Sequence, residues 1–154
     1  MKKKPEKGIL GWREIIAIPT LGIKQINVKV DTGAQTSALH VTNLKVKKRG
    51  RTKFAYFRVH PKQKSSLPII ETKAKIKDFR RIRSSNGIVS ERPVIDVDIV
   101  IGQNKFQIEL NLVNRDLMGY RMLLGRSAMK GRYLVDSGKS YQQSKHRKKR
   151  KKHI

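Results

Sequence analysis

The 154-residue sequence has no cysteine, few acidic residues, few aromatic residues and no long apolar run. Without cysteine, the chain can form neither a disulfide bond nor a thiolate metal site. No apolar segment approaches the roughly 20 residues that a transmembrane helix needs. The basic start, MKKKPEKGILGW, also lacks the apolar stretch of a secretory signal. We therefore expect a cytoplasmic protein with one domain, stabilised by an ordinary hydrophobic core and without a membrane partner.

Acidic residues are scarce, with 11 Asp and Glu against 37 Lys and Arg, which gives a net charge of +26. The first seven residues contribute +3 and residues 142–154 contribute +7, which leaves +16 on residues 8–141. Such a charge attracts polyanions without distinguishing among nucleic acids, ribosomes, anionic membranes and acidic protein tails. Blocks of like charge seldom fold alone. We predict a flexible basic lead-in over residues 1–8, a folded domain over 9–138 and a disordered basic tail over 139–154.

Alternation of apolar and polar residues dominates the chain between its basic ends. Residues 95–101 and 106–112 each place apolar side chains at every second position, and residues 26–30 do the same over a shorter length. In the second segment, Asn111 falls on the outward face. Residues 102–105 predict a hairpin loop, 15–18 and 54–59 are further strand candidates, and 127–130 leave room for one short helix. The pattern predicts an all-β fold, either a small barrel or a sandwich.

A possible reactive carboxylate follows the alternating segment that ends at Val30. Asp31 is succeeded by Thr32, Gly33 and Ala34, and the glycine permits a tight turn. A carboxylate held on such a turn, near a hydroxyl group and backbone N–H donors, suits acid–base chemistry. A DTG triplet also occurs in ordinary turns with an exposed aspartate, so this motif needs support from a second one.

The second motif is Leu124-Gly125-Arg126, which follows an apolar segment and precedes the predicted helix. With both motifs in this order, the chain resembles the retropepsin family of aspartic peptidases. GWRE, KVDTGAQTSALH, RSSNGIVSERPVI, NRDLMGYRMLLGR and GRYLVD make it most similar to a bacterial single-domain subfamily often labelled ATP-dependent zinc proteases. The resemblance covers nearly all of residues 11–141. It implies a small closed all-β barrel of retropepsin type with one short C-terminal helix.

The zinc and ATP parts of that label find no support in the residues. His40 and His60 show no HExxH or paired-ligand spacing, so we interpret both as structural or surface residues. A phosphate loop would need glycine five residues before Gly138, and that position is Tyr133. We predict neither a metal ion nor a cofactor.

The resemblance assigns the catalytic carboxylate to Asp31, with Thr32, Gly33 and Ala34 supporting the active-site turn. It implies two aspartates that share one proton and activate a water molecule, so a second carboxylate is needed. A homodimer would supply Asp31 from each copy. The alternative source is the same chain, with Asp116 or Asp136, although turn or cap roles explain these two residues as well.

Two further segments receive roles from the resemblance. A substrate-binding flap is expected at Ser84, Ser85, Asn86 and Gly87, because Asn-Gly is a strong signal for a hairpin tip. Leu124, Gly125 and Arg126 are expected to pack beside the active-site turn. Gln35 stands where viral retropepsins usually carry an acidic residue that pairs with this arginine, so Arg126 lacks its expected partner.

We therefore predict an aspartic endopeptidase that acts on a peptide or protein, with a polyglutamate-tailed ribosomal protein as a candidate substrate. The alternative is a non-catalytic β-barrel that binds RNA or the ribosome, for which the basic tail would be the contact. A degenerate family member that binds peptides without cleaving them is a third interpretation. A nucleic-acid module would be expected to interleave exposed aromatic residues with its basic ones, and the chain has only nine aromatic residues.

Overall fold

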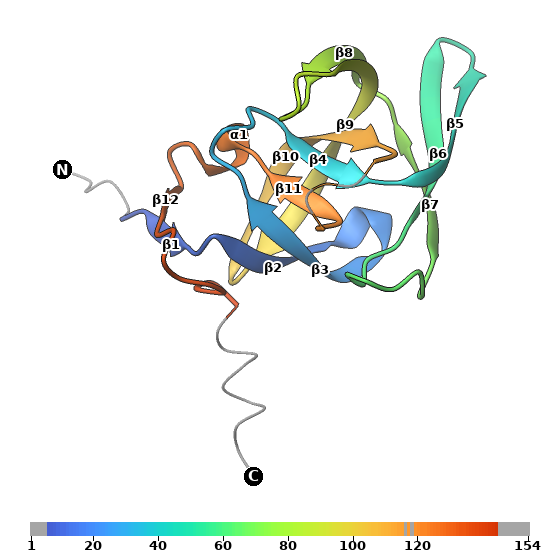
Figure 1. Cartoon of the computed structure of the whole chain (residues 1–154). Helices are drawn as coiled ribbons and strands as arrows, with labels where there is room; N and C mark the ends of the chain where they lie inside the picture. Colours follow the sequence, from blue (N-terminus) through green and yellow to red (C-terminus); the bar gives the residue numbers. More distant parts are fainter. Residues whose placement is uncertain (1–5, 116, 118, 145–154) are drawn as a thin grey trace, which may run out of the picture.

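The computed structural model describes residues 6–115, 117 and 119–144 (Figure 1). Its strands are β1 (Gly8–Leu10), β2 (Arg13–Ile18), β3 (Ile23–Val30), β4 (Ser37–His40), β5 (Thr42–Arg49), β6 (Thr52–Val59), β7 (Ile70–Lys75), β8 (Asp78–Arg83), β9 (Val89–Ile101), β10 (Asn104–Val113), β11 (Met122–Leu124) and β12 (Tyr133–Val135). A 3₁₀ turn covers Pro19–Leu21, and one helix, α1, covers Arg126–Met129. Within the described part of the chain, no helix is long and apolar enough to cross a membrane.

Six strands form a closed ring in the order β10, β4, β11, β3, β2 and β9, with β9 pairing again with β10. Strand β8 extends the ring at β9. The longest pairing is the antiparallel hairpin of β9 and β10, in which Ile101 faces Asn104. The connecting turn is therefore Gly102-Gln103, shorter than the predicted loop of residues 102–105. The all-β prediction is confirmed, and helix α1 lies one residue earlier than predicted.

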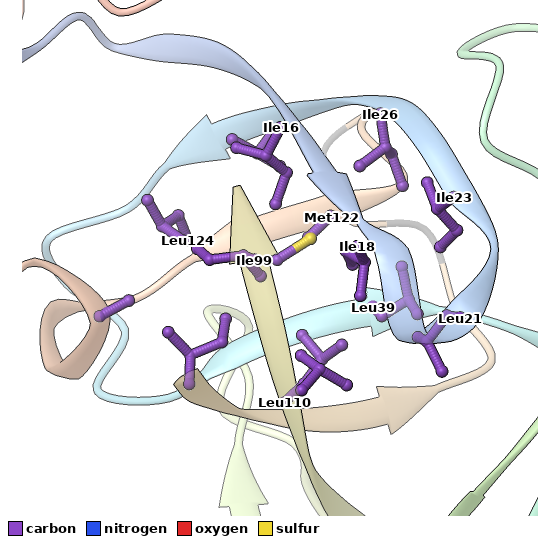
Figure 2. Close-up of a cluster of buried hydrophobic side chains, with 14 of the residues drawn as sticks. Ile16, Ile18, Leu21, Ile23, Ile26, Leu39, Ile99, Leu110, Met122 and Leu124 are labelled. Atoms are coloured by element: carbon purple, nitrogen blue, oxygen red, sulfur yellow. The ribbon is translucent and has the colours of Figure 1, made fainter. Parts of the chain in front are cut away.

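The ring encloses one apolar core, because the alternate side chains of its strands point inward. Ile95, Ile99 and Ile101 of β9 are fully buried, as are Leu110 and Leu112 of β10. Figure 2 shows residues from β2, β3, β9, β10 and β11 meeting in this core. Full burial of each such side chain contributes about 1.5–3 kcal/mol. The core therefore fixes the register of the strands that carry Asp31 and Gly125.

A separate sheet of three antiparallel strands, in the order β5, β6 and β7, packs beside the ring. Ala55, Phe57 and Val59 of β6 are buried in the main core. The other face of β6 carries Phe54 and Tyr56. The sheet is thus bound to the ring through one face, and the predicted strand at 54–59 is confirmed as part of β6.

The first and last strands, β1 and β12, form a parallel pair that begins with Gly8 opposite Tyr133. Residues 139–144, placed in the tail by the sequence, also contact the domain through Glu14. This buried carboxylate accepts hydrogen bonds from the N–H groups of Gly11 and Gln142 at 2.7 Å and of Gln143 at 3.0 Å. The rest of the tail lies outside the described residues.

Candidate active site

Asp31 lies on the turn that directly follows β3, and its position comes from strand pairing. Strand β11 runs parallel to β3 with Leu124 opposite Val30. Because parallel strands end at the same edge of a sheet, the residues after each strand become neighbours. The N–H of Asp31 accordingly donates to the carbonyl of Leu124 at 2.9 Å. The two motifs that are more than 90 residues apart in the sequence are therefore adjacent in the fold.

The carboxylate of Asp31 is oriented by its own turn. Its Oδ1 accepts a hydrogen bond from the N–H of Gly33 at 2.9 Å, and its carbonyl accepts one from Ala34 at 3.3 Å. A Cβ atom at residue 33 would lie 3.2 Å from Oδ1, so glycine gives the carboxylate room. The side chain of Asp31 is half-buried, while Thr32 and Gly33 are exposed. One face of the turn is thus free to meet another molecule.

Gly125 allows the late motif to approach this turn closely. A Cβ atom there would lie 2.7 Å from the carbonyl carbon of Thr36, which is backbone and cannot easily move. The N–H of Gly125 donates to the buried hydroxyl of Ser37 at 3.0 Å. Only glycine fits at this contact without moving the chain.

Arg126 binds the active-site turn through carbonyl groups. Its Nη1 donates to the carbonyl of Thr32 at 2.9 Å and to that of Gly33 at 3.2 Å. Its backbone N–H donates to the carbonyl of Ala34 at 2.7 Å. In place of the acidic partner expected at residue 35, the arginine therefore uses three backbone oxygens of the turn. The expected proximity of Arg126 to the turn holds, although its bonding could not be read from the sequence.

The predicted flap is the hairpin tip between β8 and β9. Ser84 and Ile88 close the turn by a backbone hydrogen bond of 2.9 Å, and Gly87 has a φ of +84° that favours glycine. Asn86 Oδ1 accepts hydrogen bonds from the Ser84 hydroxyl and from the N–H of Ile88. Asn86 and Gly87 therefore act locally as turn residues. Ser85, Asn86 and Ile88 are exposed.

Asp31 and this hairpin tip line the same cavity, which has a volume of about 150 Å³. Ser84, Ser85 and Asn86 contribute from the flap side, and Ala34 contributes from the active-site turn. Ala38, Leu117 and Leu123 form an apolar part of the wall. The structure thus brings some of the predicted turn residues and most of the predicted flap residues to one cavity, whereas Thr32, Gly33 and Gly87 do not line it.

The polar residues of the cavity that sequence reasoning missed include Arg92, Asn111 and Arg115. Arg92 is 4% exposed and Asn111 is 1% exposed, so the outward position predicted for Asn111 is wrong. Arg92 Nη1 donates to Asn111 Oδ1 at 2.9 Å, and Asn111 Nδ2 donates to the carbonyl of Ser37 at 2.8 Å. The period-two pattern gave no signal for this, because the partners of Asn111 are Arg92 and Ser37, which are distant in the sequence.

Among the described residues that line the cavity, Asp31 is the one carboxylate, whereas several arginines carry positive charge. No ion pair joins Arg92 or Arg115 to an acidic residue within the described part of the chain. Burial, and then the nearby charge of Arg115, lowers the pKa of Arg92 below its usual value. Arg83 lines the same cavity, so three guanidinium groups beside an open space provide a site for an anionic group.

A second carboxylate does not line this cavity among the described residues. Asp136 lies in a different hollow, bordered by β12 and the Gly102-Gln103 turn. Its Oδ1 accepts a hydrogen bond from the N–H of Gly138 at 3.1 Å, which is a turn role. Asp116, the other candidate from the same chain, lies outside the described residues. The structure therefore does not bring Asp136 to Asp31.

The two histidines of the folded part have hydrogen-bond partners. His40 Nδ1 lies 2.9 Å from the carbonyl of Arg115, and His60 Nε2 lies 2.7 Å from the hydroxyl of Thr42. Over the described ranges, no group of three or more His, Cys, Asp or Glu residues could hold a metal ion. These contacts agree with the structural interpretation of both residues.

Comparison with known families matches residues 9–146 to a model described as retropepsin-like aspartic endopeptidase RimB. The chain is also similar to proteins named probable alpha-L-glutamate ligase. It is 44% identical to one from Shewanella pealeana over 135 residues, which are 88% of this chain and 30% of that protein. It is 43% identical to one from Parasynechococcus marenigrum over 136 residues. The chain thus spans about a third of the length of the curated relatives that it matches.

Among solved structures, the chain resembles Lpg0085 from Legionella pneumophila, a protein described as having unknown function. The TM-score is 0.72 with 23% identity, over 90% of this chain and 99% of the other. At this identity, the likeness concerns the fold alone.

Proposed function

Because the chain belongs to the RimB-like family of retropepsin-like aspartic endopeptidases, we propose that it hydrolyses peptide bonds with Asp31 as a catalytic carboxylate. The observation that carries this proposal is the single cavity that Asp31 shares with the flap residues Ser84, Ser85 and Asn86. A carboxylate oriented by its own turn, beside a space that a hairpin tip can cover, suits acid–base catalysis on an extended peptide.

In the proposed reaction, one carboxylate removes a proton from a water molecule as the water attacks the peptide carbonyl. A second, protonated carboxyl group donates a hydrogen bond to that carbonyl oxygen. Two carboxyl groups this close cannot both ionise cheaply, so the pair titrates as a unit. The hydrogen bond from Gly33 N–H and the anchoring of the turn by Arg126 keep Asp31 in one orientation.

We propose that the second carboxyl group is Asp31 of another copy of the chain in a homodimer. Exposure of Thr32 and Gly33 supports this proposal, because a two-fold axis next to the turn would cover both residues. The lack of another described carboxylate in the cavity supports it as well. Thr32 would then contact its counterpart across the axis.

The first experiment compares Asp31→Asn with Asp98→Asn, a matched loss of one charge on a half-exposed position of β9. The Asp31 variant should lower peptide hydrolysis by about 10²–10⁴-fold without lowering the melting temperature. The Asp98 variant should keep normal activity. Full activity of Asp31→Asn would contradict the peptidase proposal.

A mixing experiment tests the source of the second carboxyl group. Wild-type and Asp31→Asn chains are unfolded together, refolded at a series of ratios and assayed at constant total protein. A site made by two copies requires total activity to fall as the square of the wild-type fraction. A linear fall would show that each chain carries a complete site, which would contradict the dimer and retain the peptidase.

For the substrate, we propose a peptide with acidic side chains, with a polyglutamate tail on a ribosomal protein as the candidate. Arg83, Arg92 and Arg115 support this, because they place three cations in the wall of the Asp31 cavity, none with an ion pair to a carboxylate in the described part of the chain. The relatives named probable alpha-L-glutamate ligase add support, since a hydrolase paired with such a ligase would act on glutamate-containing chains. A glutamate side chain beside the cleaved bond could reach these guanidinium groups.

Arg115→Gln tests this specificity, with Arg81→Gln as a matched control on an exposed position of β8 outside the cavity. The Arg115 variant should lower kcat/KM for a glutamate peptide about tenfold and leave a glutamine peptide of the same sequence unchanged. The Arg81 variant should change neither value. Equal losses on both peptides would contradict the acidic specificity without contradicting hydrolysis itself.

The alternative of a non-catalytic protein that binds RNA or the ribosome predicts that Asp31→Asn changes no function. The tail that would serve as its contact falls mainly on residues 145–154, outside the described part of the chain. A cytoplasmic location remains part of the proposal and is checked by cell fractionation.

A further inference from the structure

The outward face of the three-stranded sheet combines aromatic rings with lysines, a pattern that the sequence did not predict. Ala55, Phe57 and Val59 of the central strand β6 point into the core. Because side chains alternate along a strand, Phe54 and Tyr56 lie on the opposite face, where both are half-buried. The two rings are therefore neighbours on one outward surface.

Strand pairing places a lysine on each side of both rings. Phe54 lies opposite Lys47 on β5 and Lys75 on β7, and Tyr56 lies opposite Lys45 and Lys73. Residues directly opposite each other on neighbouring strands share a face and lie about 5 Å apart. These two rows, each lysine–ring–lysine, form what we call the Tyr56 face, which consists of Lys45, Lys47, Phe54, Tyr56, Lys73 and Lys75.

The lysines of the Tyr56 face remain available to an anionic partner. All four are exposed, and none has an ion pair with a carboxylate in the described ranges. The nitrogen atoms of Lys47 and Lys73 lie 4.9 and 5.9 Å from the centre of the Tyr56 ring. Glu71 is the single acidic residue in β5–β7, and it is paired with Arg58 at 2.8 Å.

We propose that the Tyr56 face binds single-stranded RNA. Proteins that bind single strands combine cations that contact the phosphates with aromatic rings on which successive bases stack. A four-stranded sheet with exposed aromatics uses the same arrangement in a common RNA-binding module. The hydroxyl groups of Tyr56 and of Thr52, which lies on the same face of β6, offer partners for the 2′-hydroxyl that distinguishes RNA from DNA.

This binding surface is separate from the proposed peptidase site. The Asp31 cavity is lined by the ring and by the hairpin of β8 and β9, and no residue of β5–β7 contributes to it. Figure 1 shows β5–β7 on the side of the ring away from α1. The two activities can therefore be measured independently, and Asp31→Asn should bind RNA as the wild type does.

The experiment measures binding of the full chain to a fluorescein-labelled ten-nucleotide RNA by anisotropy over a salt series. A quadruple variant replaces all four lysines of the face by glutamine: Lys45→Gln, Lys47→Gln, Lys73→Gln and Lys75→Gln. It should reduce the magnitude of the slope of log K for RNA binding against log salt by about 3, because each phosphate contact contributes about 0.7. Its control removes four exposed lysines from outside the face: Lys24→Gln, Lys62→Gln, Lys105→Gln and Lys130→Gln. The control carries the same net charge and should retain most of the slope.

The contribution of the rings is tested by Tyr56→Leu and by an abasic oligonucleotide with the same number of phosphates. Both changes should weaken binding about tenfold through loss of stacking. The lysine variants carry their substitutions at exposed positions, so the test stays valid if Tyr56→Leu fails to fold.

An equal loss of slope in the two lysine variants, or undiminished binding of the abasic strand, would overturn the proposal. DNA binding as tight as RNA binding would also overturn it, as would a preference for anionic vesicles or an acidic peptide.

Discussion

The ring of strands and the three-stranded sheet are built from similar half-buried strands, yet the main cluster of charges on each is arranged in the opposite way. In the ring, Arg80 binds both oxygens of Glu109 at 2.7 Å, and Lys77 lies 2.9 Å from the same carboxylate. On the Tyr56 face of the sheet, four lysines have no carboxylate partner among the described residues. The cations around Glu109 are therefore neutralised within the fold, whereas the lysines of the Tyr56 face are left for a partner.

This contrast indicates which parts of the positively charged chain can attract an anionic partner. A surface whose cations are already paired contributes little to long-range attraction, while an unpaired cluster creates a local positive potential. The cavity beside Asp31 is a second place where cations cluster, because Arg83, Arg92 and Arg115 line it and none has an ion pair with a carboxylate in the described ranges. On this basis the chain offers two separate sites for anions, one small and enclosed and one broad and exposed.

The largest effect in the comparison should come from Gly125→Ala, which places a side chain at a close backbone contact beside the active-site turn. The added Cβ would lie 2.7 Å from the carbonyl carbon of Thr36, so the active-site turn and helix α1 must separate. Backbone displacement of this kind costs about 1–3 kcal/mol or more, and peptide hydrolysis should be lost. Chemical denaturation and a peptidase assay measure both effects.

Gly138→Ala is the control, because its Cβ would meet Asp136 at an ordinary 3.5 Å. RNA binding at the Tyr56 face should survive in Gly125→Ala wherever the fold persists, since that face lies on the other sheet. Normal activity of Gly125→Ala would show that the turn is not fixed by this contact.

The next largest effect should come from Glu14→Gln, at the join between the ring and residues 139–144. The carboxylate accepts four hydrogen bonds, from Gly11, Gln142, Gln143 and the hydroxyl of Ser144. An amide NH₂ group in its place would face N–H donors, and an unsatisfied buried group costs about 1–3 kcal/mol. We expect a lower melting temperature and faster proteolysis after residue 138, measured by calorimetry and mass spectrometry.

Glu91→Gln is the matched substitution at an exposed position of β9 and should leave both values unchanged. Protection of residues 139–144 from proteolysis in Glu14→Gln would show that another contact holds this segment.

How far the sequence predicts this fold depends on which residues carry the apolar alternation. Residues 95–101 and 106–112 have one apolar and one polar face, and both are strands as predicted. The strand β5 is rich in lysine and leaves Val46 exposed, so its sequence lacks an apolar period. Its structure comes from pairing with β6, which is a tertiary contact that local patterning does not encode.

In the candidate site, too, the sequence indicates some features, whereas others depend on tertiary contacts. The turn that carries Asp31 leaves a local signal because it contains glycine, whereas the roles of Asp31 and Gly125 were predicted from the resemblance to the retropepsin family. The bonding of Arg126 to three carbonyl groups, and the burial of Arg92 against Asn111, depend on segments that are distant in the sequence. For a polar residue within an apolar strand, the sequence does not indicate whether its hydrogen bonds are made with other residues or with water.

A smaller effect is expected from Arg126→Lys, which keeps the charge and removes the planar guanidinium that reaches Thr32 and Gly33. We expect kcat to fall about tenfold, because a misplaced turn shifts Asp31 relative to the water. KM should change little, since Arg126 does not line the cavity. Steady-state kinetics separates the two parameters, and a rise in KM at constant kcat would assign Arg126 to substrate binding instead.

The smallest effect concerns the charge network of the ring and its dependence on pH. Hydrogen bonds first from Arg80 and then from Lys77 lower the pKa of Glu109 from 4.5 to about 2. The group therefore stabilises the fold fully above pH 4.5, and this contribution is lost as the pH falls through 2, where the folded state also becomes protonated. Glu109→Gln should lower the free energy of unfolding by about 1 kcal/mol at pH 7. This difference from the wild type should shrink between pH 5 and pH 2 in urea unfolding curves.

The control is Glu71→Gln on the three-stranded sheet, which removes a more exposed ion pair and should change the free energy of unfolding little at any pH. If the difference in the free energy of unfolding between Glu109→Gln and the wild type did not depend on pH, the role of Glu109 would come from packing and not from charge. The contrast between the ring and the sheet would then rest on the unpaired lysines alone.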